Sequence, residues 1–321
     1  MVLKKALRNA GYRTSAFMLL LIYIEPCASS KLVRCPGAYC GRTVDTNSPR
    51  NLTDCGKCPR GYRSDGFICH KCASSLTLYD WLYLGFMVLL IPVLNSDFIS
   101  FFEPKRRSVG FLYLTTAMEA FFAAIIALLV VEPVGSLTLQ SCKVESIRDW
   151  YTVFFNPKPD YVNEIRCTQE AVYPLYTIVF FYYAICLLLS VTLRQIVLWF
   201  LKDISGRKST YASMYLLPIM LVTHAIFSGV VYYSFPYLIL VASSVGNAVY
   251  LSKSDELWKE FFRNPESVAT LATYTLANAY GIISITQFEN PLRDSLLLIL
   301  TGLPTFFYFV TYRLTDPVKF Y

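Results

Sequence analysis

The stretch that decides the fold covers residues 171–201 and reads AVYPLYTIVFFYYAICLLLSVTLRQIVLWFL. A transmembrane helix needs about 20 mostly apolar residues to cross the hydrocarbon core of a bilayer. This stretch is longer than that, so it predicts a helix that crosses the membrane with a tilt or extends past it. A helix is the expected form because a backbone surrounded by lipid must satisfy its own hydrogen bonds.

Six further apolar stretches flank this one, and each is long enough to cross a bilayer or nearly so. They cover residues 79–102, 109–131, 211–233, 237–251, 267–287 and 295–312, and SFPY predicts a turn at Pro236. Of the 321 residues, 55% are hydrophobic and only 16% are charged, whereas a soluble domain carries about 25% charged residues. The sequence therefore predicts an all-α polytopic membrane protein with about seven transmembrane helices over residues 78–312.

The positive charge of the chain indicates an orientation in the membrane. The net charge is +7, and much of it lies next to the apolar stretches, where the positive-inside rule places it. With the N-terminus in the lumen, the cytosolic loops and tail hold 11 Lys and Arg, against 5 in the luminal loops between helices. This bias predicts a cytosolic tail over residues 313–321, and no nucleic-acid partner is expected.

The N-terminal segment is typical of a signal peptide over residues 1–29. Four basic residues come first, and they are Lys4, Lys5, Arg8 and Arg13. The apolar core at 16–24 is too short to span a bilayer, and small residues follow it in PCASS. An uncleaved signal anchor is the alternative, and both interpretations place the following segment in the lumen.

Residues 30–77 form a predicted Cys-rich luminal domain. Its cysteines are Cys35, Cys40, Cys55, Cys58, Cys69 and Cys72. The spacing of CGKC and CHKC would also suit zinc, but an even number of cysteines in an oxidising lumen favours disulfides. Six cysteines allow 15 pairings, and the sequence does not choose among them. The sequon NLT at Asn51 predicts N-glycosylation in the same luminal segment.

The segment at 132–170 is a predicted luminal loop between two transmembrane helices. It contains Cys142 and Cys167, which we expect to form a disulfide with each other. Cys27 lies in the signal segment and Cys186 in an apolar stretch, so neither needs a partner.

The aromatic residues of this loop have two interpretations. FNPKPDYV is rich in turn residues, and a long ordered loop often carries function. The pattern of Trp150, Tyr151 and Tyr161 favours the other interpretation, in which the loop is a lid packed on the helix ends.

Several motifs together resemble the Jun-kinase-associated membrane protein family. They are LYDWLYLGFM, DWYTVFFNPKPDYV, EAVYPLYTIVFFYYA, YYSFPYLILV and AYGIISI, together with CPGAYCGRT, CGKCPRG and CHKC. The resemblance implies a seven-span protein of the endoplasmic reticulum membrane. It also implies an adaptor that brings proteasomes and RING-type ubiquitin ligases to misfolded proteins, and a link to stress-kinase signalling.

Polar residues inside the predicted helices are the first candidate site. They are Glu119, His224, Asn247 and Asn278. A carboxylate inside the membrane is expensive, and it can mark a transport path or a groove that senses substrates. The alternative is a Glu119 that is hydrogen-bonded to another helix and holds the helices together, which we favour.

A second candidate lies in the predicted cytosolic loop SDELWKEFFRNPES. Its Leu257, Trp258, Phe261 and Phe262 would share one face of a short helix. This face could dock a cytosolic partner, or it could rest on the lipid surface as an amphipathic turn.

Three classes of function remain open at this point. The first is the adaptor, whose partners would be RING-type ubiquitin ligases, the proteasome, a stress-activated kinase and the lipid bilayer. The second is a heptahelical receptor with a Cys-rich ectodomain, and the third is a transporter or lipid-handling protein that uses Glu119. No H-E-x-x-H, G-x-S-x-G or P-loop motif occurs in the sequence, so we expect neither an enzyme nor a cofactor or metal.

Overall fold

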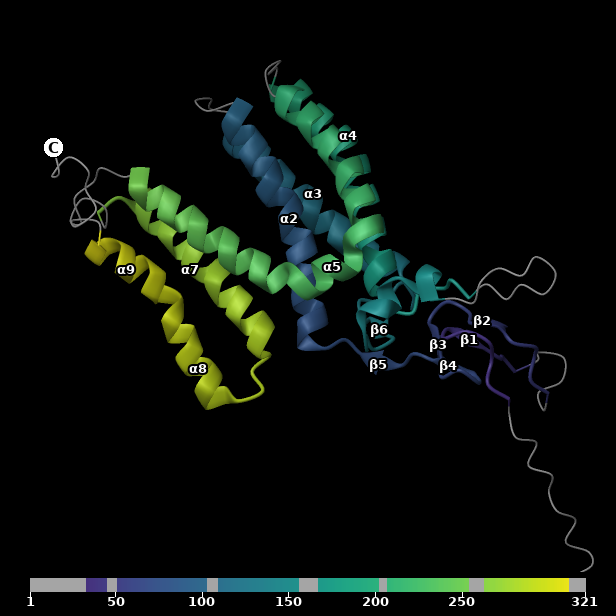
Figure 1. The fold of residues 1–321 in the computed structure, drawn as a ribbon. Coiled ribbons are helices and arrows are strands. Elements are labelled where there is room, and N and C mark those ends of the chain that lie inside the picture. Colours follow the sequence, from purple (N-terminus) through teal and green to yellow (C-terminus); the bar gives the residue numbers. More distant parts are fainter. Residues whose placement is uncertain are drawn as a thin grey trace, which may run out of the picture.

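The computed structural model describes residues 33–44, 51–102, 109–155, 167–201, 207–253 and 263–311. These residues form a bundle of helices with a small Cys-rich unit against one end (Figure 1). The signal segment, the predicted tail and the aromatic cluster Leu257, Trp258, Phe261 and Phe262 lie outside the described residues.

Five helices in the described part of the chain are long and apolar enough to cross a membrane. They are α2 (Leu78–Phe102), α3 (Val109–Val130), α4 (Leu175–Leu201), α5 (Arg207–Lys253) and α7 (Pro265–Thr286). Their outer faces expose large apolar side chains, such as Leu89 on α2, Phe121 on α3 and Val222 on α5. A helical protein with several candidate membrane spans is therefore confirmed, but the number of long helices is five where seven apolar stretches were expected.

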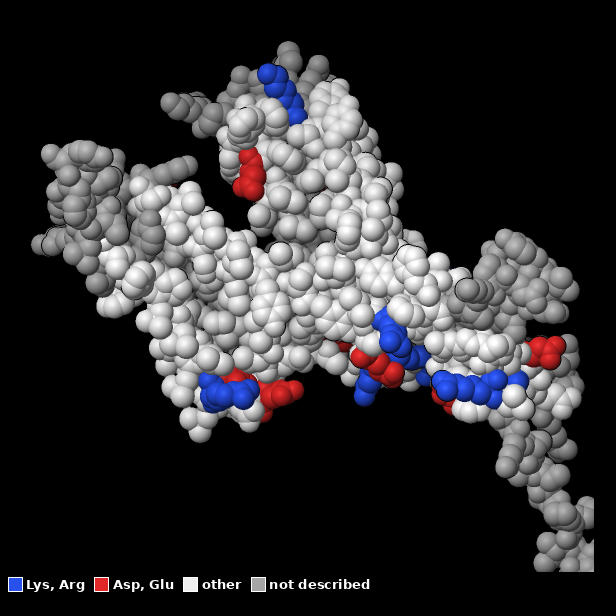
Figure 2. Space-filling view, viewed as in Figure 1, with Lys and Arg blue, Asp and Glu red and all other residues white. Residues whose placement is uncertain are grey.

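The charged side chains are distributed as a membrane position of the helices would require. Figure 2 shows most of them along the edge that holds the Cys-rich unit and the turn before α8, with one acidic and one basic patch toward the opposite end and an uncharged surface between. A lipid-facing surface excludes charged groups, because their transfer into hydrocarbon is costly.

The largest departure from the prediction is α5, which contains both the fourth and the fifth apolar stretches. Pro236 lies inside this helix of 47 residues, where a turn was expected. A proline inside a helix removes one backbone hydrogen bond and bends the helix without necessarily ending it. Figure 1 shows α5 changing direction between its two parts.

The two parts of α5 pack against different helices. Before the bend Ser213 is bonded to α4, and after it Ser243 is bonded to α7. Between them, the Tyr232 hydroxyl donates a hydrogen bond of 2.8 Å to Asp80 at the start of α2. The middle of α5 therefore lies at the Cys-rich end of the bundle, and both its termini lie toward the opposite end.

These contacts divide the bundle into two halves. We call α2, α3, α4 and the part of α5 before Pro236 the first half. The second half holds the rest of α5, α7, and the short helices α8 (Pro291–Ile299), η3 (Leu300–Gly302) and α9 (Leu303–Thr311). The expected seventh span corresponds to this interrupted run.

The Cys-rich unit consists of short antiparallel strand pairs. The strand β1 (Cys40–Gly41) pairs with β2 (Gly56–Lys57), and β3 (Tyr62–Ser64) pairs with β4 (Cys69–Lys71). The third pair joins β5 (Ser74–Ser75) to β6 (Gln140–Ser141). Because β6 lies between α3 and α4, this pair fixes the Cys-rich unit to the loop that connects two candidate spans.

All eight cysteines expected to be oxidised form disulfides, but the expected Cys142–Cys167 pair is wrong. The pairs are Cys35–Cys55, Cys40–Cys167, Cys58–Cys69 and Cys72–Cys142. The zinc alternative is excluded with them, since these thiols are occupied. Cys186 is free and buried, as expected.

The strand register explains why Cys142 and Cys167 do not pair with each other. Ser74 is opposite Ser141, and an antiparallel pair in this register brings Cys72 next to Cys142. The amide of Gln169 donates a hydrogen bond to the Tyr39 carbonyl, which places Cys167 next to Cys40. Each cysteine of the loop therefore faces the N-terminal segment, at a sequence distance that no local pattern reveals.

Aromatic rings fill the junction between this unit and the helices. Trp150 lies in the 3-10 helix η1 (Ile147–Trp150) and is only 7% exposed. Its ring centroid is 5.8 Å from that of Tyr83 and 5.0 Å from that of Tyr232. The interpretation of the loop as a lid on the helix ends is confirmed for Trp150, while Tyr161 lies outside the described residues.

Candidate functional site

The most strongly polar place inside the first half is an ion pair between Glu119 of α3 and Arg194 of α4. The Arg194 Nε lies 2.9 Å from Oε1 and 3.0 Å from Oε2 of the carboxylate, and Nη2 lies 2.8 Å from Oε2. Both side chains are almost fully buried. A fork of this kind is the strong form of a carboxylate–guanidinium contact, because two parallel hydrogen bonds share the charge.

Hydroxyl groups complete the surroundings of the guanidinium. Arg194 Nη1 donates to Ser213 of α5 at 2.5 Å, and Nη2 donates to Thr116 of α3 at 3.2 Å. Ser213 in turn donates to the Ser209 carbonyl. The cluster therefore joins α3, α4 and α5 through groups that satisfy most of the hydrogen-bonding capacity of Arg194.

The sequence predicted Glu119 and missed Arg194. Arg194 is the one charged residue in α4, and a basic residue inside an apolar stretch is itself a signal for an intramembrane partner. The geometry supports the interpretation of Glu119 as a link between helices, with the difference that its partner is a charge. A carboxylate held by a guanidinium is a poor candidate for binding a transported ion, because its lone pairs are already engaged.

His224 of α5 is a packed core histidine. Its Nε2 lies 3.0 Å from the Tyr176 carbonyl, and its ring stacks on Tyr176 and meets the edge of Phe180. The side chain is 1% exposed. These contacts join α5 to the first turn of α4.

The two asparagines lie in the second half of the bundle. The Asn247 amide donates to the Thr305 hydroxyl of α9 at 2.7 Å. The Ser243 hydroxyl donates to Asn278 of α7 at 2.6 Å. The four predicted polar residues thus occupy three separate places, and each of them makes a hydrogen bond between helices. They do not form one site.

A polar network that the sequence did not predict fixes the Cys-rich unit to the loop. The Tyr39 hydroxyl donates to Asp149 Oδ1 at 3.0 Å, and Arg63 Nη2 lies 3.1 Å from Asp149 Oδ2 and 2.9 Å from Glu145. Asp149 Oδ2 also accepts from the backbone of Glu145 and Ser146. Burial and the neighbouring Asp149 raise the pKa of the Tyr39 phenol well above its usual value, so this hydroxyl remains a donor.

Glu170 organises the start of α4 in the same region. Its carboxylate accepts hydrogen bonds from the backbone N–H groups of Tyr176 and Thr177, both at 3.0 Å, and from the Thr177 hydroxyl. These are the donors that a helix N-terminus leaves free. Burial raises the pKa of Glu170, and the bonds from Thr177 and Tyr176 oppose that rise.

The remaining predicted sites are exposed or outside the described residues. Asn51 is exposed in a bend, a position that a glycan could reach; its glycosylation remains a prediction. Among the described residues, no group of three or more His, Cys, Asp or Glu side chains could hold a metal ion.

The family model described as JNK1/MAPK8-associated membrane protein matches residues 35–317. The chain belongs to this family. The protein of that name from Homo sapiens is 44% identical over 294 residues, which cover 89% of this chain and 94% of the human protein. The Caenorhabditis elegans homolog is 32% identical over 306 residues, covering 87% and 93% of the two chains. No solved structure matches.

Membership in the JNK1/MAPK8-associated membrane protein family confirms the resemblance seen in the sequence. The matched range contains all four disulfides of the described residues, the Glu119–Arg194 pair and every candidate span. The features described above therefore belong to the part of the chain that defines the family.

Proposed function

We propose that this chain is an adaptor of the endoplasmic reticulum membrane. It would bring RING-type ubiquitin ligases and proteasomes to misfolded proteins, and it would modulate signalling by a stress-activated kinase. The observation that carries the proposal is the 44% identity, over 89% of the chain, to a human protein named for its association with JNK1/MAPK8. The kinase link follows that name, while the ligase and proteasome partners follow from the resemblance of the motifs.

The contacts of the polar groups support a function in binding. Glu119 is held by Arg194, and His224 is packed between aromatic rings. Each group contributes to joining helices, as expected for a scaffold that presents surfaces to partners. An adaptor needs no catalytic group, and we propose that this chain is not an enzyme.

We further propose seven crossings of the membrane with the Cys-rich unit in the lumen. At 1.5 Å per residue, a helix of 47 residues is about 70 Å long, more than twice the hydrocarbon thickness of about 30 Å. Since both ends of α5 lie away from the Cys-rich end, its two parts would cross separately. The run of α8, η3 and α9 would supply the seventh crossing, and the disulfides support a luminal position of the Cys-rich unit.

This topology places the partner surface at the end of the bundle opposite the Cys-rich unit. The segments that connect α2 to α3, α4 to α5 and α5 to α7 would face the cytosol, together with the C-terminal tail. The aromatic cluster of Leu257, Trp258, Phe261 and Phe262 lies in the third of these segments. Aromatic residues are typical anchors of binding interfaces, so we propose this cluster as the docking element.

The test is affinity capture of the full chain from mild detergent, with and without misfolding stress. We expect ubiquitin ligase and proteasome subunits to be captured with the wild type, and the Trp258→Ala/Phe262→Ala variant to capture several-fold less. The matched control is Trp199→Ala/Phe200→Ala, which removes the same two side-chain types from exposed positions at the end of α4. Both variants should be glycosylated at Asn51 like the wild type.

Two outcomes would contradict parts of the proposal. Undiminished capture by the Trp258→Ala/Phe262→Ala variant at equal expression would indicate that the cluster only rests on lipid. Capture of none of these partners by the stressed wild type would contradict the adaptor itself. Delivery of the wild type to the plasma membrane would favour the alternative function, a heptahelical receptor with a Cys-rich ectodomain.

A further inference from the structure

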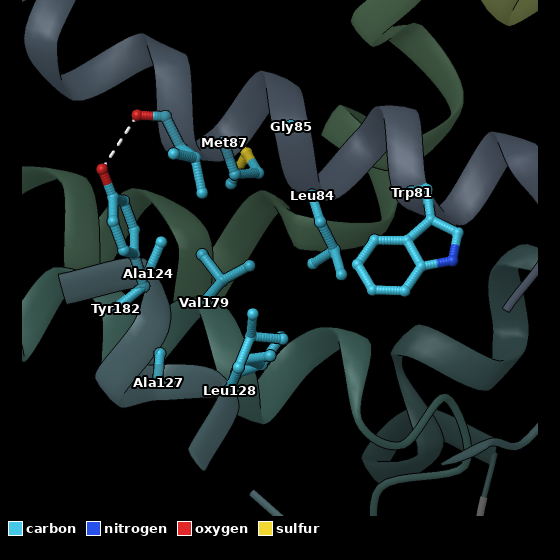
Figure 3. A pocket seen from close by; sticks show the side chains of 11 residues that line it. Trp81, Leu84, Gly85, Met87, Ala124, Ala127, Leu128, Val179 and Tyr182 are labelled. Carbon is cyan, nitrogen blue, oxygen red and sulfur yellow. Dashed lines mark hydrogen bonds between the residues drawn. The ribbon is translucent and has the colours of Figure 1, made fainter. Parts of the chain in front are cut away.

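A cavity of about 210 Å³ lies between α2, α3 and α4, in the part of the bundle near the Cys-rich unit. Figure 3 shows Trp81 and Leu84 of α2, Ala124 and Leu128 of α3, and Val179 of α4 around it. These residues come from three of the helices that are apolar enough to span a membrane.

The wall of the cavity offers almost no hydrogen-bonding group. The Tyr182 hydroxyl, which lies at its edge, already donates to the Val88 carbonyl at 2.8 Å (Figure 3). A buried water needs two to four polar partners, and an apolar cavity of about 150 Å³ stays dry and binds benzene. The wall therefore favours a hydrocarbon occupant over water.

The space exists because small residues face large ones. Ala124 and Ala127 on α3 leave room opposite Leu84. On α2, a Cβ atom at Gly85 would approach the hydroxyl of Tyr280 on α7 to 2.7 Å, so the helix has no room for a side chain at this position of the cavity lining. The void is thus determined by the sequence of three helices.

The position of the cavity relative to the membrane indicates what fills it. Trp81 lies in the first turn of α2 and is 44% exposed, which is typical of a tryptophan at the level of the lipid headgroups. The outer faces of the same helices expose Val93, Phe122 and Ile126, so hydrocarbon surrounds them. Because Trp81 both lines the cavity and is exposed, the cavity can be reached beside this residue from the lipid leaflet on the Cys-rich side.

We propose that this cavity is a binding site for the end of one phospholipid acyl chain, which enters beside Trp81. The volume is only moderately larger than that of the cavity that takes benzene, so a flexible chain fits it better than the rigid four-ring body of a sterol. The occupant fills the space between α2, α3 and α4 and makes the lipid a part of the folded bundle. This inference is independent of the proposed adaptor function.

The test uses the full chain in detergent with phosphatidylcholine that carries a diazirine near the end of one acyl chain. After illumination, mass mapping should find the crosslink on α2 and α3 residues of the cavity, and excess unlabelled phosphatidylcholine should suppress it. The variant Ala124→Leu fills the cavity and should lower this crosslink at least five-fold. Ala117→Leu makes the same change at an exposed position of α3 and should leave it unchanged.

Three results would overturn the proposal. Equal cavity labelling of the two variants would mean that the probe contacts only the outer surface. A diazirine sterol that labels the cavity residues while the phospholipid does not would identify a different occupant. Wild-type labelling that rises with probe concentration without saturating, and that excess unlabelled phosphatidylcholine does not reduce, would show that no defined site exists. This measurement does not depend on whether Ala124→Leu folds.

Discussion

The two halves of the helix bundle bury polar groups by different means. In the first half, Glu119 and Arg194 carry opposite charges, and two disulfides hold the loop between α3 and α4 to the Cys-rich unit. In the second half, Asn247 and Asn278 form neutral hydrogen bonds with hydroxyl groups. The halves diverge away from the Cys-rich end (Figure 1). Because an unpaired charge costs more in an apolar medium than an unpaired amide, the halves should respond unequally to similar substitutions.

The largest effect is expected from breaking the ion pair. Replacing Glu119 by Ala leaves the Arg194 guanidinium buried without its counter-charge. Loss of one partner of a buried pair costs about 3 to 5 kcal/mol. The Glu119→Ala variant should therefore lose most of its thermal stability in detergent and accumulate poorly, as measured by fluorescence-detected size exclusion after heating.

A double variant separates the charge from the packing. Replacing Glu119 and Arg194 together by Leu and Met removes both charges, and replacement of a buried pair by hydrophobic groups of similar volume is often neutral or stabilising. We expect this double variant to recover most of the stability lost by Glu119→Ala. A Glu119→Ala variant as stable as the wild type would show that the charge of this pair does not hold the first half together, and a double variant as unstable as Glu119→Ala would assign the loss to packing.

A somewhat smaller effect is expected from opening the Cys40–Cys167 disulfide. These cysteines are 127 residues apart in the sequence. The stabilisation that a disulfide gives increases with the length of the loop it closes, and it is typically about 2 to 4 kcal/mol. In the Cys40→Ser/Cys167→Ser variant, the Cys-rich unit should become sensitive to a protease while α7 stays protected. Limited proteolysis of the purified chain measures this directly.

The Cys58–Cys69 disulfide is the matched control. It closes a separation of only 11 residues inside the Cys-rich unit, so its removal should cost less by the same entropy argument. Equal protease sensitivity of the two double variants would mean that the link to the loop adds nothing to the stability of the unit.

Asn278→Ala tests the second half and should have a more modest effect. Hydrogen bonds between membrane helices contribute about 0.6 kcal/mol on average and at most about 1.7 kcal/mol. The variant should therefore fold and lose a few degrees of thermal stability. Thr273→Ala is the control, because this exposed hydroxyl bonds only within its own helix. A loss as large as that of Glu119→Ala would remove the difference between the halves.

The sequence predicted the membrane class because hydrophobic length is a local property. The apolar stretches, the oxidised cysteines and the residues Glu119, His224, Asn247 and Asn278 could all be read from their immediate neighbours. The continuity of α5 could not be predicted in this way, because whether Pro236 bends a helix or ends it depends on the helices that pack on either side of it. Those helices are α4 and α7, on opposite sides of Pro236 in the chain.

The disulfide pairing and the partner of Glu119 share the same difficulty. Cys40 meets Cys167, and Glu119 meets Arg194 75 residues later in the chain. Such contacts are set by strand register and by the order of helices in space, neither of which has a local signature. Arg194 was nevertheless recognisable as a basic residue inside an apolar stretch, and pairing it with Glu119 would have been a sound prediction.

The smallest expected effect concerns acid and the turn between β3 and β4. Asp65 accepts hydrogen bonds from the backbone N–H of Ile68 and Phe67 and from His70. The Ile68 bond is the main cause that lowers the pKa of Asp65 to about 2. The ionised form therefore adds stability that is fully present above the unfolded pKa of about 3.9 and is lost as the pH falls toward 2. Because the Asp65 carboxylate is half exposed, the contribution should stay below about 1 kcal/mol.

Hydrogen exchange between pH 5 and pH 2.5 can resolve this contribution. After correction for the intrinsic exchange rate, the β3–β4 amides of the wild type should lose protection as the pH falls. Asp65→Asn keeps an oxygen acceptor for the two backbone groups but cannot ionise, so its protection should be lower at pH 5 and nearly independent of pH. The amides around Asn278, whose partners are neutral, should show no such acid response. An equal acid response of Asp65→Asn and the wild type would assign the effect to another carboxylate of the Cys-rich unit, and an equal response around Asn278 would extend the dependence on charge to the second half.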